Sequence, residues 1–543
     1  MVSSGRVNAR WAPLSILVVA SALGAWAGIR ASQAVPVAET PAPVEAAVPA
    51  PAGLVAEASC ARPDATWHKV QAAVGGVLLL APPTFRELLA AVAGVPSLAS
   101  VVDDGSPVYA AVSESGGWVV AARAVSAQRA RSTLEADSAS GLRVDSHAGK
   151  MDVLAAPRTW VGLAGTWVVV ASDRDALTTL GPYAYRTLPT LPPPKADLVA
   201  TVSHAELDGP IRAMLGARWA ALRAWLLAKD DEQRRDHGGR EPDLGDPKAL
   251  VAELDAIEKT YESRVAAMDR ADAALDLDDD GAHLRVTLAA PRAGDVATWV
   301  DDLEGGSPQP LASSSGEALA TIFWRSDPND RARAAKEANH TLERGRGDRR
   351  PASDRAKLGA ALESIAKARA GWALVSVSGG AESGVLLRLA TNDASAIAAT
   401  VEGVVDLAKQ PSWAKWDADA LGVTKIARTS SHATFDGARG TIRAAWSPRP
   451  GELDLAAGVD ADTVLASAAP PLALASDPKV AAWLRTLGGS VVWAAVARPL
   501  LVAPSPRSDP ALVAFLHGHR SVVLDARASN VLVREIVALV RSN

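Results

Sequence analysis

Four aspartates and a glycine stand within six positions of the stretch ALDLDDDGAHLRVTLAAP, and this spacing could bind calcium. An EF-hand loop needs oxygen ligands at positions one, three and five, glycine at six and a bidentate acid at twelve, between two helices. Asp276, Asp278, Asp280 and Gly281 match the first half, but position twelve is Thr287 and the flanks alternate apolar and polar residues as strands do. The sequence therefore predicts a hairpin turn, with a weak cation site as the alternative.

Three serines stand three residues before a lysine, the S-x-x-K spacing of penicillin-recognising enzymes. They are Ser364, Ser412 and Ser476. Those enzymes also need S-D-N and K-T-G, and neither tripeptide occurs in this chain. We interpret the three matches as chance.

His517 and His519 in FLHGHRS would face the same side of a strand and could share a metal ion. No acidic or cysteine ligand stands close in sequence, so we expect surface histidines in a loop before the last hairpin. The tripeptide Arg346, Gly347 and Asp348 lies among further arginines and predicts an exposed basic loop.

The remaining short motifs with a known mechanism are missing. The chain has no H-E-x-x-H, no G-x-S-x-G, no phosphate loop and no dinucleotide fingerprint. We therefore predict no catalytic, cofactor-binding or metal-binding residues and no cofactor.

The secondary-structure elements predicted around these residues repeat one pattern in two halves of the chain. PVYAAVSESGGWVVAA (107–122) and GWALVSVSGGAESGVLLRLA (371–390) both alternate as hairpins, and each precedes a helical stretch. Strands with equivalent neighbours follow in both halves, so Trp118 should correspond to Val385 and Val169 to Leu455 in equivalent strands. The sequence predicts an α+β fold of two repeated modules, each an antiparallel sheet with packed helices.

One segment breaks this repeat. Two patterns of helical spacing, Ile211 to Leu226 and Leu250 to Met268, flank a charged loop and predict an antiparallel helical hairpin inserted at about 209–271. Such a hairpin either covers a sheet or serves as an arm that docks a partner.

The N-terminus predicts export. Arg6 and Arg10 precede an uncharged run from Trp11 to Ile29, which at 1.5 Å per residue is about as long as a bilayer core is thick. Positive residues stay in the cytoplasm, so the rest of the chain should lie outside it. Ser32 and Ala34 offer an alternative small-x-small cleavage site.

These signals divide the chain into five parts. We predict a transmembrane anchor or signal peptide (1–34), a Pro/Ala-rich linker (35–63), a first module (64–290), a second linker (291–315) and a second module (316–543). Cys60 is the only cysteine, so no intrachain disulfide can form.

Anchor, spacer and the doubled pattern around TWVVVASDRDALTTL (166–180) resemble uncharacterised bacterial envelope-anchored proteins with duplicated exported domains. The resemblance implies an exported α+β repeat and no catalytic residues. A net charge of -5 does not indicate the basic surface that a nucleic-acid-binding protein needs.

We therefore expect a non-catalytic envelope protein that binds or scaffolds, single-pass in the inner membrane with its bulk in the periplasm, or secreted after cleavage. Besides the membrane, its partner would be an envelope protein, a lipid or a glycan. The alternative is an exported, hydrolase-like enzyme whose site assembles only in three dimensions.

Overall fold

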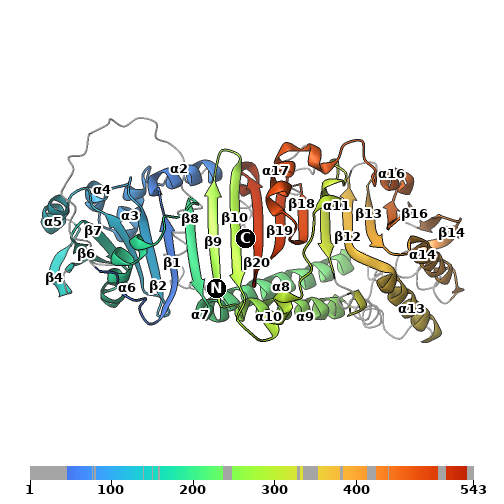
Figure 1. Cartoon of the computed structure of the whole chain (residues 1–543), viewed down its shortest axis with the longest axis horizontal. Coiled ribbons are helices and arrows are strands. Elements are labelled where there is room, and N and C mark those ends of the chain that lie inside the picture. The colour runs from blue at the N-terminus through green and yellow to red at the C-terminus, as the bar shows by residue number, and fades with distance from the viewer. Residues whose placement is uncertain are drawn as a thin grey trace. The chain divides into compact units, whose positions relative to one another are not determined.

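The computed structural model describes residues 46–534, except 76–77, 79–80, 138–139, 149–150, 157–158, 237–246, 327–330, 334–351, 380–382, 412–422, 438–439 and 499–508. The fold is α+β, with helices packed on antiparallel sheet, and the chain divides into two compact units. The first unit comprises 1–209, 268–289 and 527–543, and the second comprises 210–267 and 290–526. Figure 1 shows the elements of both.

Among the described residues, ten strands form the sheet of the first unit. They are β1 (Leu54–Cys60), β2 (Val108–Ser113), β3 (Trp118–Arg123), β4 (Arg143–Ala148), β5 (Met151–Ala155), β6 (Trp160–Ala164), β7 (Trp167–Ala171), β8 (Leu198–Ser203), β9 (Arg270–Leu277) and β10 (Gly281–Ala289). Antiparallel pairing gives the order β4-β5-β6-β7-β3-β2-β1-β8-β9-β10.

Helices cover both faces of the central strands of this sheet. They are α2 (Pro63–Val74), α3 (Phe85–Ala93), α4 (Leu98–Val101), α5 (Ala127–Ala136), α6 (Arg174–Arg186), η3 (Leu188–Thr190) and α7 (His204–Glu206). One face packs against α3, α4 and α5, and the other against α6. Because both faces are buried, β3 and β7 are runs of Val and Ala rather than alternating strands. Asp173 caps α6 by accepting a hydrogen bond from the Ala176 amide at 2.7 Å.

The second unit holds another set of strands. They are β11 (Ala320–Arg325), β12 (Arg369–Ser378), β13 (Gly384–Thr391), β14 (Val423–Arg428), β15 (His432–Gly437), β16 (Gly440–Arg449), β17 (Glu452–Gly458), β18 (Val491–Ala497), β19 (Ala511–Gly518) and β20 (Ser521–Ser529), the last belonging to this unit as far as Ala526. Their order is β14-β15-β16-β17-β13-β12-β11-β18-β19-β20. Strand for strand, this is the order of the first unit.

The strand register refines the expected equivalences. Trp118 and Val385 lie in the corresponding strands β3 and β13, and Val169 and Leu455 lie in β7 and β17. Val169 belongs to the core under α6, however, whereas Leu455 packs against the core of the opposite face. Because a shift of one residue turns a side chain to the other face, the ladder counterpart of Val169 is Asp454.

Helices also lie on both sides of the second sheet. They are α10 (Asp295–Asp301), α11 (Gln309–Ala312), α13 (Ala352–Ala368), α14 (Ala394–Ala408), α16 (Ala461–Ala466), η7 (Leu474–Ser476) and α17 (Pro478–Leu487). The largest core cluster lies under α17 and includes the fully buried Trp483 and Phe323. On the opposite face α14 covers Trp446 and Leu453.

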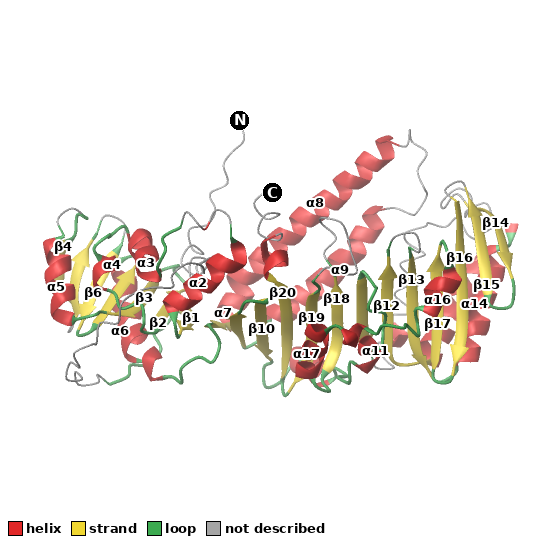
Figure 2. Cartoon of the chain, turned by 90° about the horizontal axis from the view of Figure 1, so that it is seen from above, coloured by secondary structure: helices red, strands yellow, loops and turns green. Residues whose placement is uncertain are grey.

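The predicted helical hairpin exists as α8 (Arg212–Asp236) and α9 (Pro247–Ala266). The two helices are joined by a hydrogen bond from the Trp219 indole to the Asp255 carboxylate at 2.6 Å and by an ion pair between Arg212 and Glu262 at 2.8 Å. The hairpin belongs to the second compact unit, although its sequence lies inside the first predicted module. Figure 2 shows α16 and α17 on one side of the second unit's sheet and the hairpin on the other.

Two predicted linkers hold regular structure. β1 lies inside the 35–63 segment, which is therefore not linker throughout, because Leu54–Cys60 pairs with both β2 and β8. In the 291–315 segment α10 and α11 form instead of a plain connection. The predicted N-terminal anchor lies outside the described residues, and within residues 46–534 as described no helix is long and apolar enough to cross a membrane.

Candidate functional site

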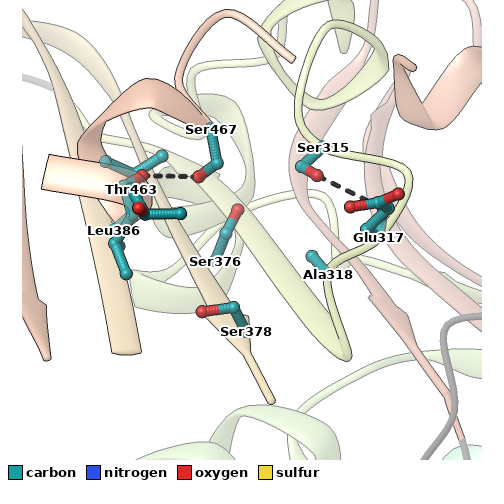
Figure 3. Close-up of a pocket in the computed structure, with 9 residues that line it drawn as sticks. Ser315, Glu317, Ala318, Ser376, Ser378, Leu386, Thr463 and Ser467 are labelled. Carbon is teal, nitrogen blue, oxygen red and sulfur yellow. Dashed lines mark hydrogen bonds between the residues drawn. The ribbon is translucent and has the colours of Figure 1, made fainter. Parts of the chain in front are cut away.

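A small polar pocket in the second unit is a candidate site. It has a volume of about 60 Å³ and lies where α16 crosses the ends of β12 and β13. Its lining consists of Ser315, Glu317, Ala318, Ser376, Ser378, Leu386, Thr463, Val464 and Ser467. Figure 3 shows hydroxyl groups from three separate chain segments around this space. The pocket therefore depends on the tertiary fold.

Backbone geometry explains why α16 lies so close to the sheet. Gly384 and Gly458 face each other in the ladder between β13 and β17. A Cβ atom on Gly384 would come 2.6 Å from a methyl group of Val464 and 2.8 Å from the Ala457 carbonyl oxygen. The helix can approach only because this position has no side chain. Its N-terminus is capped by Asp460, whose pKa is held below the ordinary value by hydrogen bonds from the amide and hydroxyl of Thr463.

Most hydroxyl protons of the pocket are already donated within the protein. Ser467 Oγ donates to the Val464 carbonyl at 2.6 Å, Thr463 Oγ1 to the Asp460 carboxylate at 3.0 Å, and Ser378 Oγ to the Gly384 carbonyl at 3.3 Å. Their free lone pairs, together with the exposed carboxylate of Glu317, make the pocket rich in acceptors. A ligand that donates several hydrogen bonds, such as a protonated amine, suits this lining.

No histidine, lysine or cysteine lines the pocket, and Glu317 is the one lining side chain that could accept a proton from a serine. The lining therefore holds no Ser–His or Ser–Lys pair. Elsewhere in the described part of the chain, no group of three or more His, Cys, Asp or Glu residues is placed to hold a metal ion.

A Ser–His–Asp chain does occur in the second unit, outside the pocket. Ser431 Oγ lies 2.9 Å from His432 Nδ1, and His432 Nε2 lies 2.7 Å from Asp462 Oδ1. In a catalytic triad the serine contacts Nε2 and a buried acid contacts Nδ1. Here the two nitrogens are exchanged, with the serine at Nδ1 and the acid at Nε2. The Asp462 side chain is 71% exposed, so its carboxylate is solvated. We assign the contact a structural role that connects β15 to α16.

A cluster of charged side chains, partly buried within the sheet, connects β13 and β17. Arg388 Nε donates to Asp454 Oδ1 at 3.1 Å, and Arg388 Nη2 donates to Glu452 at 2.8 Å. Arg449 Nε lies 3.0 Å from the other oxygen of Asp454 without hydrogen-bond geometry. Asp454 is completely buried, and burial raises its pKa despite the adjacent Arg388 and Arg449. The cluster lies within the sheet, where β13 and β17 pair.

The acidic stretch is a hairpin turn, as predicted. β9 and β10 pair on both sides of it, and Asp278 accepts hydrogen bonds from the amides of Asp280 and Gly281, both at 2.9 Å. Asp278 thus stabilises the turn by bonding to its backbone. A side chain on Gly281 would collide with the Ala528 carbonyl, so this glycine is required by packing.

The other sequence candidates are dispersed. Ser364 lies in α13 and Ser476 in η7, while Ser412 and the Arg346–Asp348 tripeptide lie outside the described residues. His517 lies in β19, and His519 lies in the turn after it. The expectation of a loop there is wrong for His517, because FLHG continues a strand paired with β18. None of these residues lines the pocket, whose own residues carried no motif.

Comparison with known proteins gives little further information. No family model matches the chain, and neither does any curated protein. Among solved structures, crystal form I of TP0453 is similar at a TM-score of 0.25 and 8% identity, covering 46% of this chain and 82% of that one. Crystal form III of TP0453 is similar at a TM-score of 0.22 and 9% identity, covering 43% of this chain and 97% of that one. Scores of this size support no argument about function.

Proposed function

We propose that the chain is an exported, membrane-tethered binding protein of the bacterial envelope, built from two copies of one α+β module. Arg6, Arg10 and the run Trp11–Ile29 support export and tethering. The shared strand order of the two units supports duplication, because ten strands reach the same order independently only rarely. A reporter enzyme that requires the periplasm, fused after Gly53, should be active, and activity of a cytoplasm-requiring reporter there would reverse the placement.

The observation that favours binding over catalysis is the pocket under α16, which offers hydrogen-bond acceptors and one exposed carboxylate but no histidine, lysine or cysteine. We assign it a protonated primary amine on the partner molecule. An ammonium group supplies three donors and a positive charge, and it is small enough to enter a pocket of about 60 Å³.

Ligand-observed NMR on the purified full chain tests this assignment with Nα-acetyl-lysine amide and its Nε-acetylated counterpart as probes. The free amine should bind and the acetylated form should not. Glu317→Gln should weaken binding about three- to fivefold, since an exposed ion pair contributes little. Glu363→Gln, an exposed carboxylate of α13, is the matched control. Equal binding of both probes would refute the assignment.

The hairpin α8–α9 is the proposed surface for a larger partner. Its helices are fixed to each other by the contacts of Trp219 and Arg212, while Leu222 is 47% and Tyr261 is 56% exposed. Leu222→Lys with Tyr261→Lys should abolish co-purification of an envelope partner without changing the unfolding midpoint. Unchanged recovery would remove the hairpin from this role. Hydrolytic turnover that disappears in His432→Gln would instead favour the enzyme.

A further inference from the structure

Arg331 is a buried arginine that is incompletely hydrogen-bonded. Arg331 follows β11 in the sequence and is only 8% exposed. Nη1 donates to the Ser326 carbonyl, but Nε makes no hydrogen bond within the described part of the chain. An unpaired buried donor on a charged group is costly, so such a position usually has a partner.

A second guanidinium lies beside it. Arg369 begins β12, and the amide of Ser326 donates to the Gly371 carbonyl at 3.0 Å, which holds the end of β11 beside the start of β12. Arg369 Nε and Nη2 are buried without an acceptor among the described residues, and so is the Ser326 hydroxyl. Three neighbouring residues thus carry four unused polar atoms.

The positive charges of Arg331 and Arg369 repel each other. Burial, and then the positive charge of Arg331, lowers the pKa of Arg369. Two guanidinium groups that repel each other in a partly buried position need a counter-ion to offset both desolvation and repulsion.

We propose that Arg331, Arg369 and Ser326 form an oxyanion site for a phosphate group. Phosphate carries close to two negative charges at neutral pH and several acceptor oxygens, so it can neutralise both arginines, whereas a carboxylate neutralises only one. The planar guanidinium donors suit phosphate oxygens, and the hydroxyl can add a further hydrogen bond. The site is independent of the amine pocket, whose lining shares none of these residues.

Thermal unfolding of the purified full chain tests the site, with inorganic phosphate and sulfate as probes in a chloride buffer of constant ionic strength. Both anions should raise the unfolding temperature of the wild type in a saturable way. Arg369→Gln and Arg331→Gln should each lower the apparent phosphate affinity about tenfold or more. Arg333→Gln, on an exposed arginine of the same helical turn, should leave it unchanged.

A charge-conserving variant guards against loss of folding. Arg369→Lys keeps the charge but loses the guanidinium fork, so it should fold and bind phosphate several-fold more weakly. No stabilisation of the wild type by either anion, or equal stabilisation of Arg369→Gln, would overturn the proposal. So would phosphate binding that appears only in Asp327→Asn or Asp330→Asn, because the chain's own carboxylate would then be the counter-ion.

Two further probes distinguish the source of the phosphate. Glycerol 3-phosphate represents a monoester such as a lipid headgroup, and inorganic phosphate represents the free ion. Tighter binding of the monoester, lost in Arg369→Gln, would assign the site to an esterified phosphate. Equal affinity would assign it to the free ion, and binding of the monoester that survives Arg369→Gln would place that ligand elsewhere.

Discussion

Equivalent positions of the two sheets hold opposite kinds of side chain. In the first unit Ala121 and Val169 face each other on β3 and β7 and are completely buried under α6. In the second unit the same two places in the ladder hold Arg388 and Asp454. The strand order therefore does not require an apolar pair there. It requires only that each strand presents a group that its opposite neighbour can satisfy.

The covering of the opposite face differs as well. Val112 in β2 is 8% exposed, whereas its ladder counterpart Val377 in β12 is 37% exposed. In the first unit α3 and α4 connect β1 to β2 and pack on this side of the sheet. In the second unit α13 instead packs against α14 through Leu358 and Leu407. Val112 is buried among Val55, Ala56, Trp118 and Val202, whereas the equivalent Val377 is exposed.

The largest effect should come from removing one partner of the buried Arg388–Asp454 pair. Arg388→Met leaves the completely buried Asp454 without the side chain that hydrogen-bonds to it, and we expect the second unit to lose about 3–5 kcal/mol of unfolding free energy. Urea denaturation of the purified chain measures this loss. A shift below about 1 kcal/mol would mean that Arg449 compensates.

Converting the pair to the chemistry of the first unit should remove most of that loss. Arg388→Met with Asp454→Leu replaces both charges by apolar groups, as at Ala121 and Val169, so no charge of the pair remains buried alone. We expect unfolding free energy within about 1–2 kcal/mol of the wild type. A double variant as unstable as Arg388→Met would show that the pair is specifically required.

The stability cost of adding a hydroxyl should differ between equivalent positions of β2 and β12. Val112→Thr buries a hydroxyl and should cost about 1–3 kcal/mol, whereas Val377→Thr, at the equivalent but exposed position, should stay within about 0.5 kcal/mol. The two variants are compared by urea denaturation. Similar costs would show that Val377 is covered in solution.

The smallest effect concerns pH. Because burial raises the pKa of Asp454 above its ordinary 3.8, the folded chain takes up this proton at a higher pH than the unfolded chain. The contribution of Asp454 to unfolding free energy therefore falls as pH rises from about 3.8 through the raised pKa. Below 3.8 both states are protonated and the contribution is constant. The difference between wild type and the double variant, measured across this range, should show that slope, and a rise with pH would contradict it.

Local patterns predicted much of this architecture because their determinants are local. Alternation and turn residues indicated the β9–β10 hairpin around Asp278 and the hairpins 107–122 and 371–390. Helical spacing indicated α8 and α9. β1 was missed because it follows a proline-rich segment, and its identity as a strand depends on pairing with β2 and β8.

The candidate sites were not predictable in the same way. Ser315, Ser376 and Thr463 are ordinary residues in sequence, and they meet only because Gly384 lets α16 approach the sheet. Arg331 and Arg369 are separated by 38 positions and meet only at adjoining strand ends. No spacing rule connects residues whose proximity is set by strand order.

The sequence by itself determined many of the strands and helices, because periodicity and capping act over a few residues, but not β1, α10 or α11. Only the tertiary structure decided which residues are buried together, since that depends on the register of distant strands and the placement of their connections. A one-residue register difference separates Leu455 from Asp454, one packed against the core near α14 and the other paired with Arg388. Side-chain direction alternates at every residue of a strand, so chemistry at such positions is fixed by pairing and not by local sequence.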